Sequence, residues 1–244
     1  MYDINFFKKS YKLKKKITSR DLSFDNLKLI EDELEFLRNK NPTIFNIETT
    51  NYCNMKCVMC PRTIYMERKN IWINDDLFEQ MLDSIKQHDD KDLENFWKWL
   101  KDEANFDHKE VSENGFYFNI VSRCLILHGY GEPFLDKYLI KRLEACKDRN
   151  IPTYFSCTPA TMTVEKAEAA MEAGLSVLKF SLDALNDEEI KKIRGKRADY
   201  DDSINKIHKI IEIKKQKGFK TLLVPCMIAL DNKNKDKKQH KKFL

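Results

Sequence analysis

The feature that most constrains the fold of this chain is a regular alternation of strand-like and helix-like segments that begins at Thr43. Short runs rich in apolar, β-branched and aromatic residues predict strands at 44–48, 124–128, 153–156, 177–182 and 221–228. Helices are predicted between them at 136–149 and 163–174, after a cap at Asn74, and before Gly218. Such alternation is typical of a parallel sheet covered by helices, so we expect an α/β fold.

The first 43 residues differ from the rest of the chain. Residues 1–20 are rich in lysine and show no apolar periodicity. Residues 23–38 predict an amphipathic helix, because their leucine and isoleucine side chains recur at helical spacing. We therefore predict a basic N-terminal tail and a helix over 1–43, followed by a core domain over 44–244.

One segment interrupts the alternation, at about 88–122, where most strand–helix units need only a short loop. A stripe from Leu93 to Leu100 predicts a helix in its first half. The pair Asn114-Gly115 predicts a turn, and Phe116 to Phe118 after it predicts an extra strand. We interpret the segment as an α/β insertion that packs its own aromatic side chains as a lid or side module.

Charge and cysteine content restrict the partners and the cellular compartment that the sequence favours. Lys and Arg number 44 and Asp and Glu 39, so the net charge of +5 is too small to require a polyanionic partner. Lysines gather at 8–16 and 233–242, which favours solvated tails over an RNA or anionic-membrane contact. Seven cysteines, without a signal-peptide core or a long apolar run, favour a soluble cytoplasmic protein with reduced thiols.

Three of the cysteines form a compact motif directly after the first predicted strand. Cys53, Cys57 and Cys60 have the spacing Cys-x3-Cys-x2-Cys. Three thiolates can hold three irons of a [4Fe-4S] cluster, whereas an electron-transfer cluster takes four, so one iron would stay open for chemistry. A zinc site completed by a fourth ligand such as Cys124 is the alternative.

With Met59 as its hydrophobic residue, this motif resembles the Cys-x3-Cys-x-hydrophobic-Cys signature of radical S-adenosylmethionine (SAM) enzymes. The resemblance implies a [4Fe-4S] cluster whose open iron binds the methionine part of SAM. It also implies reductive cleavage of SAM to a 5′-deoxyadenosyl radical that abstracts hydrogen from a substrate, with an external flavodoxin- or ferredoxin-like electron donor.

Two further segments resemble SAM-binding elements of that family. Gly129-Tyr130-Gly131-Glu132-Pro133 follows the second predicted strand and is similar to the family's glycine-rich motif, which receives the SAM ammonium group. Ser181 and Asp183 end the fourth predicted strand, where relatives contact the ribose and carboxylate of SAM. The resemblance thus implies these cofactor-binding residues: Gly129, Gly131, Glu132, Pro133, Ser181 and Asp183. Ser156 to Pro159 departs from the family pattern.

The resemblance also sets an expected architecture. Family barrels have about six strand–helix units, fewer than a closed (β/α)8 barrel, and this chain offers one fewer. We therefore expect a partial (β/α) barrel that is incomplete at its C-terminus. The chain is then either a naturally short form or a fragment of a longer protein, and we favour the fragment. The core is SPASM-like, but the sequence lacks a cysteine-rich C-terminal segment for auxiliary clusters.

The sequence leaves the substrate open. A peptide, protein or small molecule is the first interpretation, because the core resembles SPASM-type enzymes. An RNA-modifying radical SAM enzyme is the second, since both ends are basic. A truncated, inactive iron–sulfur or zinc-binding fragment is the third. No catalytic acid, base or radical-relay residue is predicted.

Overall fold

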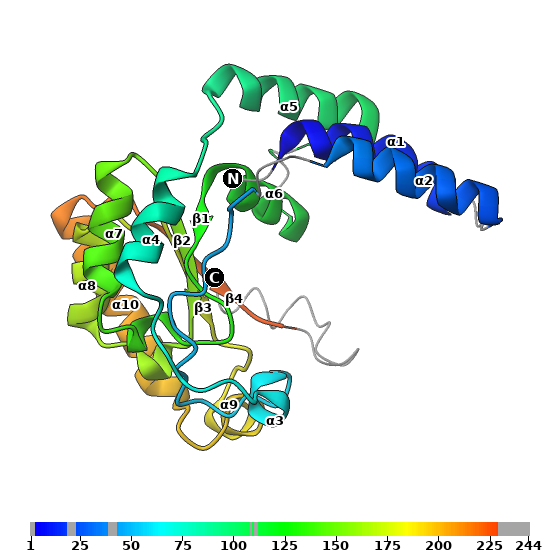
Figure 1. Ribbon diagram of the computed structural model, residues 1–244. Helices are drawn as coiled ribbons and strands as arrows, with labels where there is room; N and C mark the ends of the chain where they lie inside the picture. The colour runs from blue at the N-terminus through cyan, green and yellow to red at the C-terminus, as the bar shows by residue number, and fades with distance from the viewer. Residues whose placement is uncertain (1–2, 19–22, 39–42, 108, 110–111, 229–244) are drawn as a thin grey trace. The chain divides into compact units, whose positions relative to one another are not determined.

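A computed structural model describes residues 3–18, 23–38, 43–107, 109 and 112–228 (Figure 1). The basic run 233–242 therefore lies outside the described residues. The chain divides into two compact units. One comprises Met1–Phe45 and Glu79–Leu125, and the other comprises Asn46–Phe78 and Ile126–Leu244. The predicted domain boundary between residues 43 and 44 stays a prediction.

A parallel sheet, which belongs to the second unit except for Leu125, confirms the predicted α/β fold. Its order follows the sequence, and its strands are β1 (Leu125–Ile126), β2 (Thr153–Cys157), β3 (Val177–Ser181) and β4 (Leu222–Cys226). The pairs β2–β3 and β3–β4 are both parallel. This is a partial barrel, and four of the five predicted strands are present in it within a few residues of their predicted bounds.

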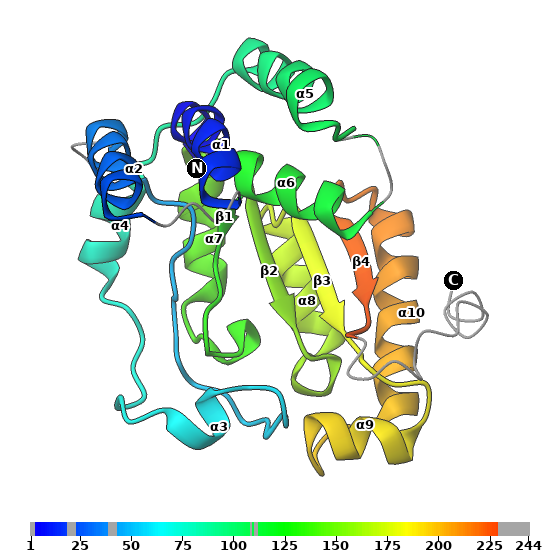
Figure 2. The ribbon, with the colours of Figure 1, turned by 90° about the vertical axis from the view of Figure 1, so that its right-hand side faces the viewer.

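Helices cover one face of this sheet. Figure 2 shows them on one side of the strands: α7 (Leu139–Asp148), α8 (Val164–Glu172) and α10 (Tyr200–Lys217). Phe155, Leu178 and Phe180 point to that side and are completely buried. On the opposite face, Ser156, Lys179 and Ser181 are partly exposed, whereas Tyr154 and Val177 are buried. The sheet therefore has one apolar and one more polar face.

The prediction of a first strand over 44–48 is wrong, because this segment does not form a regular strand of the sheet. The segment makes one parallel bridge, between Asn46 and Ile126, and Ile47 N donates to Ile126 O at 2.8 Å. Beyond it, Thr50 forms an antiparallel bridge with Trp72 instead. The backbone thus changes its pairing partner between Asn46 and Thr50, because β1 is only two residues long.

Short elements of the second unit connect the strands. The 3-10 turns Pro133–Leu135 and Pro159–Thr161 follow β1 and β2. Helix α3 (Arg62–Tyr65) follows the cysteine motif, and α9 (Asp187–Arg194) follows β3. Sequence analysis did not predict α9. Helix α4 (Asp75–Asp83) begins where it was predicted, because Asn74 Oδ1 accepts Leu77 N at 3.0 Å.

Helices form the first unit, and two sequence interpretations were wrong there. Its elements are α1 (Ile4–Thr18), α2 (Phe24–Leu37), α5 (Asp90–Ala104) and α6 (Glu113–Arg123). Residues 4–18 are helical although lysines obscure the apolar spacing of Ile4, Phe7 and Tyr11. Residues 116–118 lie in α6 rather than a strand, because Ser112 caps that helix through Gly115 N at 3.1 Å.

The core of this first unit is aromatic and aliphatic. Ile4 packs against the apolar stripe of α5, which consists of Leu93, Phe96, Trp97 and Leu100. The helical half of the predicted insertion is thereby confirmed, while its predicted strand is not. None of the helices in the described part of the chain has the length and apolar composition that crossing a bilayer requires.

Candidate functional site

The three motif cysteines lie on one loop and pack against one hydrophobic cluster. Cys57 is buried within this cluster, and Cys53 and Cys60 pack against it while partly exposed. The other side of the cluster comes from residues that follow β3, including Leu182, Ala184 and Ile190. The cysteine loop therefore lies at the carboxyl end of the parallel strands, which is where α/β sheets bind ligands.

Backbone hydrogen bonds fix the position of this loop. Tyr52 O accepts Glu132 N at 2.7 Å, and Val58 N donates to Ile193 O at 2.9 Å. Arg142, which is 1 % exposed, donates from Nη1 to Thr49 O at 2.8 Å. Because these bonds come from distant segments, the loop is held from both ends without its thiols.

The glycine motif lies directly against the segment that enters the cysteine loop. A Cβ atom on Gly131 would come 1.9 Å from Thr50 O, and one on Gly129 would come 2.6 Å from Glu48 Oε1. Glu48 Oε1 also accepts Tyr130 N at 2.6 Å. Both glycines are thus required for close approach between protein segments, and not only for access to a ligand.

Glu132 is buried and engaged with the backbone. It is 4 % exposed, its Oε2 accepts Thr158 N at 3.0 Å, and its Oε1 accepts Phe134 N at 3.5 Å. Burial raises the pKa of Glu132 to about 7, although these hydrogen bonds act to lower it. Pro133 is also buried and begins the 3-10 turn after Glu132. That Glu132 and Pro133 contact SAM stays a prediction.

Ser181 and Asp183 have different surroundings. Ser181 Oγ lies 2.9 Å from Ser156 Oγ, on the more polar face of the sheet. The side chain of Asp183 is 1 % exposed, and its backbone has a left-handed conformation, with φ of 60°. Its Oδ1 accepts Ile228 N at 2.7 Å, and its Oδ2 accepts the guanidinium of Arg194. Direct contact of either residue with SAM likewise stays a prediction.

Two residues that sequence analysis missed lie beside the cysteines. Arg194, the last residue of α9, donates from Nη1 to Cys57 Sγ at 3.5 Å. Its Nε and the Oδ1 of Asn54 are buried and have no hydrogen-bond partner among the described residues. A buried donor and a buried acceptor without partners are costly unless a further polar group is bound. No sequence pattern marks either residue.

The donor set fits the cluster that the motif implies. In the described part of the chain, no three Cys, His, Asp or Glu side chains surround a point where one ion could bind. A [4Fe-4S] cluster instead takes each thiolate at a different iron, so three thiols spread along one loop suit it. Burial raises the pKa of Cys124, the fourth ligand of the alternative zinc site, to about 12, and it also raises the pKa of Cys53.

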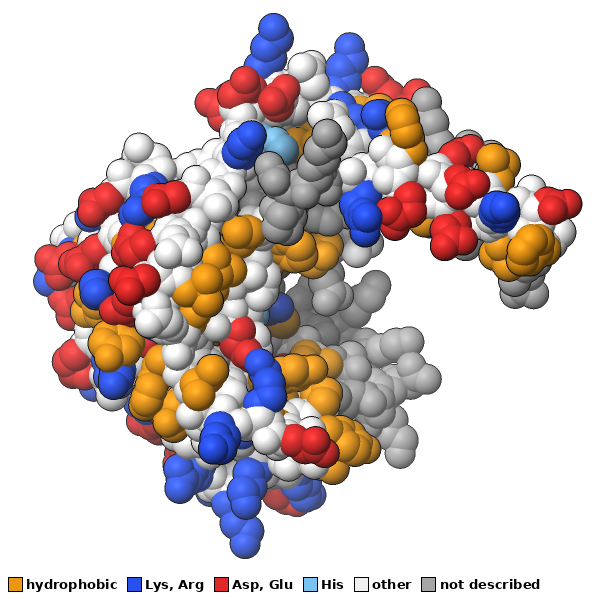
Figure 3. Space-filling model, in the orientation of Figure 1, with side chains coloured by type: hydrophobic (Ala, Val, Ile, Leu, Met, Phe, Trp, Pro, Cys, Tyr) orange, Lys and Arg blue, Asp and Glu red, His pale blue; other side chains and the backbone are white. Residues whose placement is uncertain are grey.

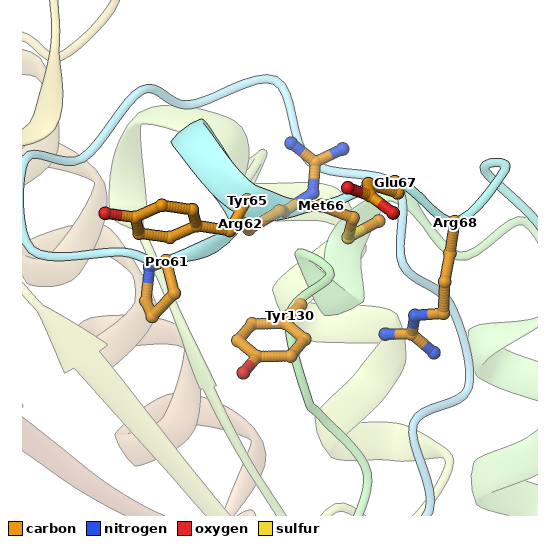
Figure 4. Close-up of a pocket in the computed structure, with 7 residues that line it drawn as sticks. All are labelled: Pro61, Arg62, Tyr65, Met66, Glu67, Arg68 and Tyr130. Carbon is orange, nitrogen blue, oxygen red and sulfur yellow. The ribbon is translucent and has the colours of Figure 1, made fainter.

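A cavity of about 300 Å³ adjoins the cysteine loop. Its lining residues come from the segment after Cys60 and from the glycine motif: Pro61, Arg62, Tyr65, Met66, Glu67, Arg68 and Tyr130. Figure 4 shows the guanidinium of Arg68 on the same side of the 61–68 segment as the Tyr130 ring, while that of Arg62 points the other way. Arg68 also pairs with Glu48 at 2.8 Å.

The surface around α3 combines apolar and basic side chains. Val58, Ile64 and Tyr65 are between 63 % and 75 % exposed. Figure 3 shows hydrophobic side chains at the surface next to Lys and Arg in this part of the molecule. Exposed apolar groups with neighbouring cations are a common feature of protein-binding surfaces.

Comparison with known protein families gives one match. The family model of the radical SAM superfamily matches residues 119–240, half of the chain, which includes the glycine motif and begins after the cysteine loop. No curated protein matches the chain.

Several solved structures are similar to this chain. The structure of Streptococcus suis SuiB bound to precursor peptide SuiA aligns over 98 % of this chain and 48 % of its own, with TM-score 0.55 and 14 % identity. Methylornithine synthase (PylB) aligns over 84 % and 51 %, with TM-score 0.48 and 13 % identity. BtrN, in complex with AdoMet and 2-DOIA, aligns over 77 % and 58 %, with TM-score 0.42 and 13 % identity. The chain spans about half the length of these proteins.

Proposed function

Because the chain belongs to the radical SAM superfamily, we propose that Cys53, Cys57 and Cys60 bind a [4Fe-4S] cluster that reductively cleaves SAM. When bound, such a cluster supplies the electron that converts SAM to a 5′-deoxyadenosyl radical, which abstracts hydrogen from the substrate. The observation that carries the proposal is the packing of all three cysteines against one hydrophobic cluster at the carboxyl end of the sheet.

The apolar surroundings suit this chemistry. Leu182, Ala184 and Ile190 are each at most 1 % exposed and exclude water from one side of the cysteine loop. Exclusion of water lowers the local dielectric and protects a reactive radical from quenching. The loop's own contribution is therefore to present thiolates at the edge of a dry region.

The polar residues of the site have two proposed roles. Gly129, Gly131 and Ser181 present backbone or hydroxyl groups toward SAM. The carboxylates of Glu132 and Asp183 are held by protein donors, so they shape the binding region chiefly by fixing the backbone around it. The partnerless atoms Arg194 Nε and Asn54 Oδ1 support a polar ligand at this place.

We propose a peptide as the first substrate class to test, ahead of other proteins and small molecules. Its support is that the SuiB structure, which aligns over 98 % of this chain, holds a precursor peptide. The electron donor would be an external flavodoxin- or ferredoxin-like protein. Its proposed docking surface is the one around α3, because exposed Ile64 and Tyr65 lie beside the loop and basic residues adjoin them.

Anaerobic reconstitution with iron and sulfide tests the proposal. After dithionite reduction, the protein should give a cluster EPR signal that changes when SAM is added, and should produce 5′-deoxyadenosine. Cys57→Ala should lose the SAM-dependent signal. Cys146→Ala, which removes a buried thiol from α7, is the matched control and should keep it. Zinc in place of iron, or a signal indifferent to SAM, would contradict the proposal.

A further inference from the structure

Arg194 contacts Cys57 through both its side chain and its backbone. Nη1 donates to Cys57 Sγ at 3.5 Å, and the thiol lies 3.9 Å from the carbonyl oxygen of Arg194. Both residues are buried, with 9 % of Arg194 and 7 % of Cys57 exposed. A guanidinium group thus contacts the sulfur of the middle motif cysteine, Cys57.

The guanidinium is fixed from its other side by Asp183. Arg194 Nη2 pairs with Asp183 Oδ2, while Asp183 Oδ1 accepts Ile228 N at 2.7 Å. Both oxygens of this carboxylate are therefore used, which leaves the guanidinium little freedom to turn away from the sulfur. A bound pair of this kind is pre-organised, because Arg presents its donors in a rigid fork.

The backbone around Arg194 is fixed against the cysteine loop as well. Val58 N donates to Ile193 O at 2.9 Å, so the residues next to Cys57 and Arg194 are bonded to each other. Gly195 has φ of 95°, which lets the chain turn away immediately after the helix. A Cβ atom there would come 3.4 Å from Lys56, so this turn lies directly against the loop.

The electrostatic consequence depends on the apolar environment. Cys57 lies among Leu182, Ala184 and Ile190, where the effective dielectric is low and a nearby charge acts strongly. Hydrogen bonds to cluster sulfurs and nearby charges are among the factors that set the reduction potential of an iron–sulfur centre. A cation stabilises the reduced form more than the oxidised form, because the reduced form is more negative.

We propose that Arg194 is a positioning residue that holds the Cys57 sulfur and raises the reduction potential of the cluster ligated there. The inference rests on the proposed function, in that it requires a cluster at Cys57. It goes beyond that function by assigning to one residue of α9, far from the motif in sequence, the control of how readily the cluster is reduced.

The alternative role for Arg194 is a purely structural ion pair with Asp183. Redox potentiometry followed by EPR separates the two, because loss of an ion pair changes stability but leaves a cluster potential unchanged. Arg194→Gln removes the charge and should shift the potential of the reconstituted protein to a more negative value. Arg194→Lys keeps the charge without the fork and should give a smaller shift in the same direction.

Arg197→Gln is the matched control. Arg197 lies three positions further on, is exposed, and its replacement changes the net charge equally. The reduction potential of the cluster in this control should equal that in the protein without substitutions. An unchanged potential in Arg194→Gln would overturn the inference.

A second variant covers the case in which Arg194→Gln fails to fold. It leaves Asp183 buried without its cation, which is strongly destabilising. Arg194→Gln combined with Asp183→Asn removes both charges and should show a smaller negative shift, because loss of the carboxylate charge acts in the opposite direction while the hydrogen bond to sulfur is still lost. If neither of these two variants binds a cluster, the reduction potential of Arg194→Lys, compared with that of Arg197→Gln, tests the inference. Failure of the unchanged protein to bind any cluster contradicts the proposed function, whereas equal potentials in cluster-bound variants contradict this inference alone.

Discussion

At Gly131, a single added methyl group should disturb the segment that enters the cysteine loop. The Cβ of alanine would come 1.9 Å from Thr50 O, a backbone atom next to Thr49, whose own carbonyl oxygen accepts a hydrogen bond from Arg142. We expect Gly131→Ala to lower the free energy of unfolding by about 3 kcal/mol, the upper part of the range for overpacking. Urea unfolding measures this change, and iron uptake should fall with it.

Gly218→Ala is the control for that substitution. Gly218 differs from Gly131 in two ways: its backbone is left-handed, with φ of 68°, and no atom lies within 4 Å of its added Cβ. The cost should be about 1 kcal/mol from backbone strain alone, with unchanged iron uptake. Equal costs for the two variants would show that close approach at Gly131 is not what matters.

Glu132 gives a pH dependence with a definite sign. Burial raises its pKa to about 7 in the folded protein from the ordinary value of 4.5. The folded state therefore holds a proton that the unfolded state releases first, so stability should fall as pH rises from about 4.5 to about 7 and level off above that. The full effect is at most about 3 kcal/mol.

Comparison with Glu132→Gln isolates this effect. Unfolding free energies of both proteins, measured without iron between pH 4 and pH 8, should differ in slope over that interval. The variant lacks the titrating carboxyl group, so its curve should be flatter. Parallel curves would mean that Glu132 is ionised in the folded protein throughout.

At the scale of elements, α9 carries the residue that contacts Cys57. Asn186 caps this helix through a hydrogen bond from Glu189 N at 2.9 Å. We expect Asn186→Ala to cost about 1 kcal/mol and to raise hydrogen exchange within Asp187–Arg194. Asn186→Asp keeps an acceptor and should leave exchange unchanged. Asp199→Ala, at the cap of α10, should raise exchange in α10 instead.

The elements that could be predicted well from the sequence are those determined by residues within or next to the element. Strands 153–156 and 177–182 are apolar runs bounded by turn residues, and α4 has a cap that is visible in the sequence. Residues 44–48 looked equally strand-like, but pairing depends on a partner about 80 positions away, and β1 is only two residues long. Residues 116–118 are β-like by composition, yet the Ser112 cap commits them to a helix.

The same distinction applies to the site. The cysteine and glycine motifs are each contiguous, so they could be found from spacing alone. Arg194 lies 137 positions from Cys57, and Arg142 lies 93 positions from Thr49. Nothing in the local sequence distinguishes these arginines from the many exposed basic residues, because burial and partners are properties of the folded chain.

At the scale of the whole molecule, the two units have separate hydrophobic clusters. Phe96 is 1 % exposed in the first unit and touches Phe7 and Trp97. We expect Phe96→Ala to destabilise that unit by about 3 to 5 kcal/mol. Hydrogen exchange should rise in α1 and α5, while iron uptake by the second unit stays unchanged.

Tyr117→Ala provides a surface control for Phe96→Ala. Tyr117 belongs to the same unit but is 55 % exposed, so its removal should change stability by no more than about 0.5 kcal/mol. Loss of iron uptake in Phe96→Ala alone would show that the second unit depends on the first for its folding.

The anchoring of the cysteine loop bears on how the protein would survive oxygen. The bonds that position the loop, from Glu132 N to Tyr52 O, from Val58 N to Ile193 O and from Arg142 to Thr49 O, involve no sulfur. Oxidative loss of inorganic iron and sulfide would therefore leave the loop in its place. Rebuilding the proposed cluster would then require iron and sulfide and reduced thiols, but no refolding of the loop.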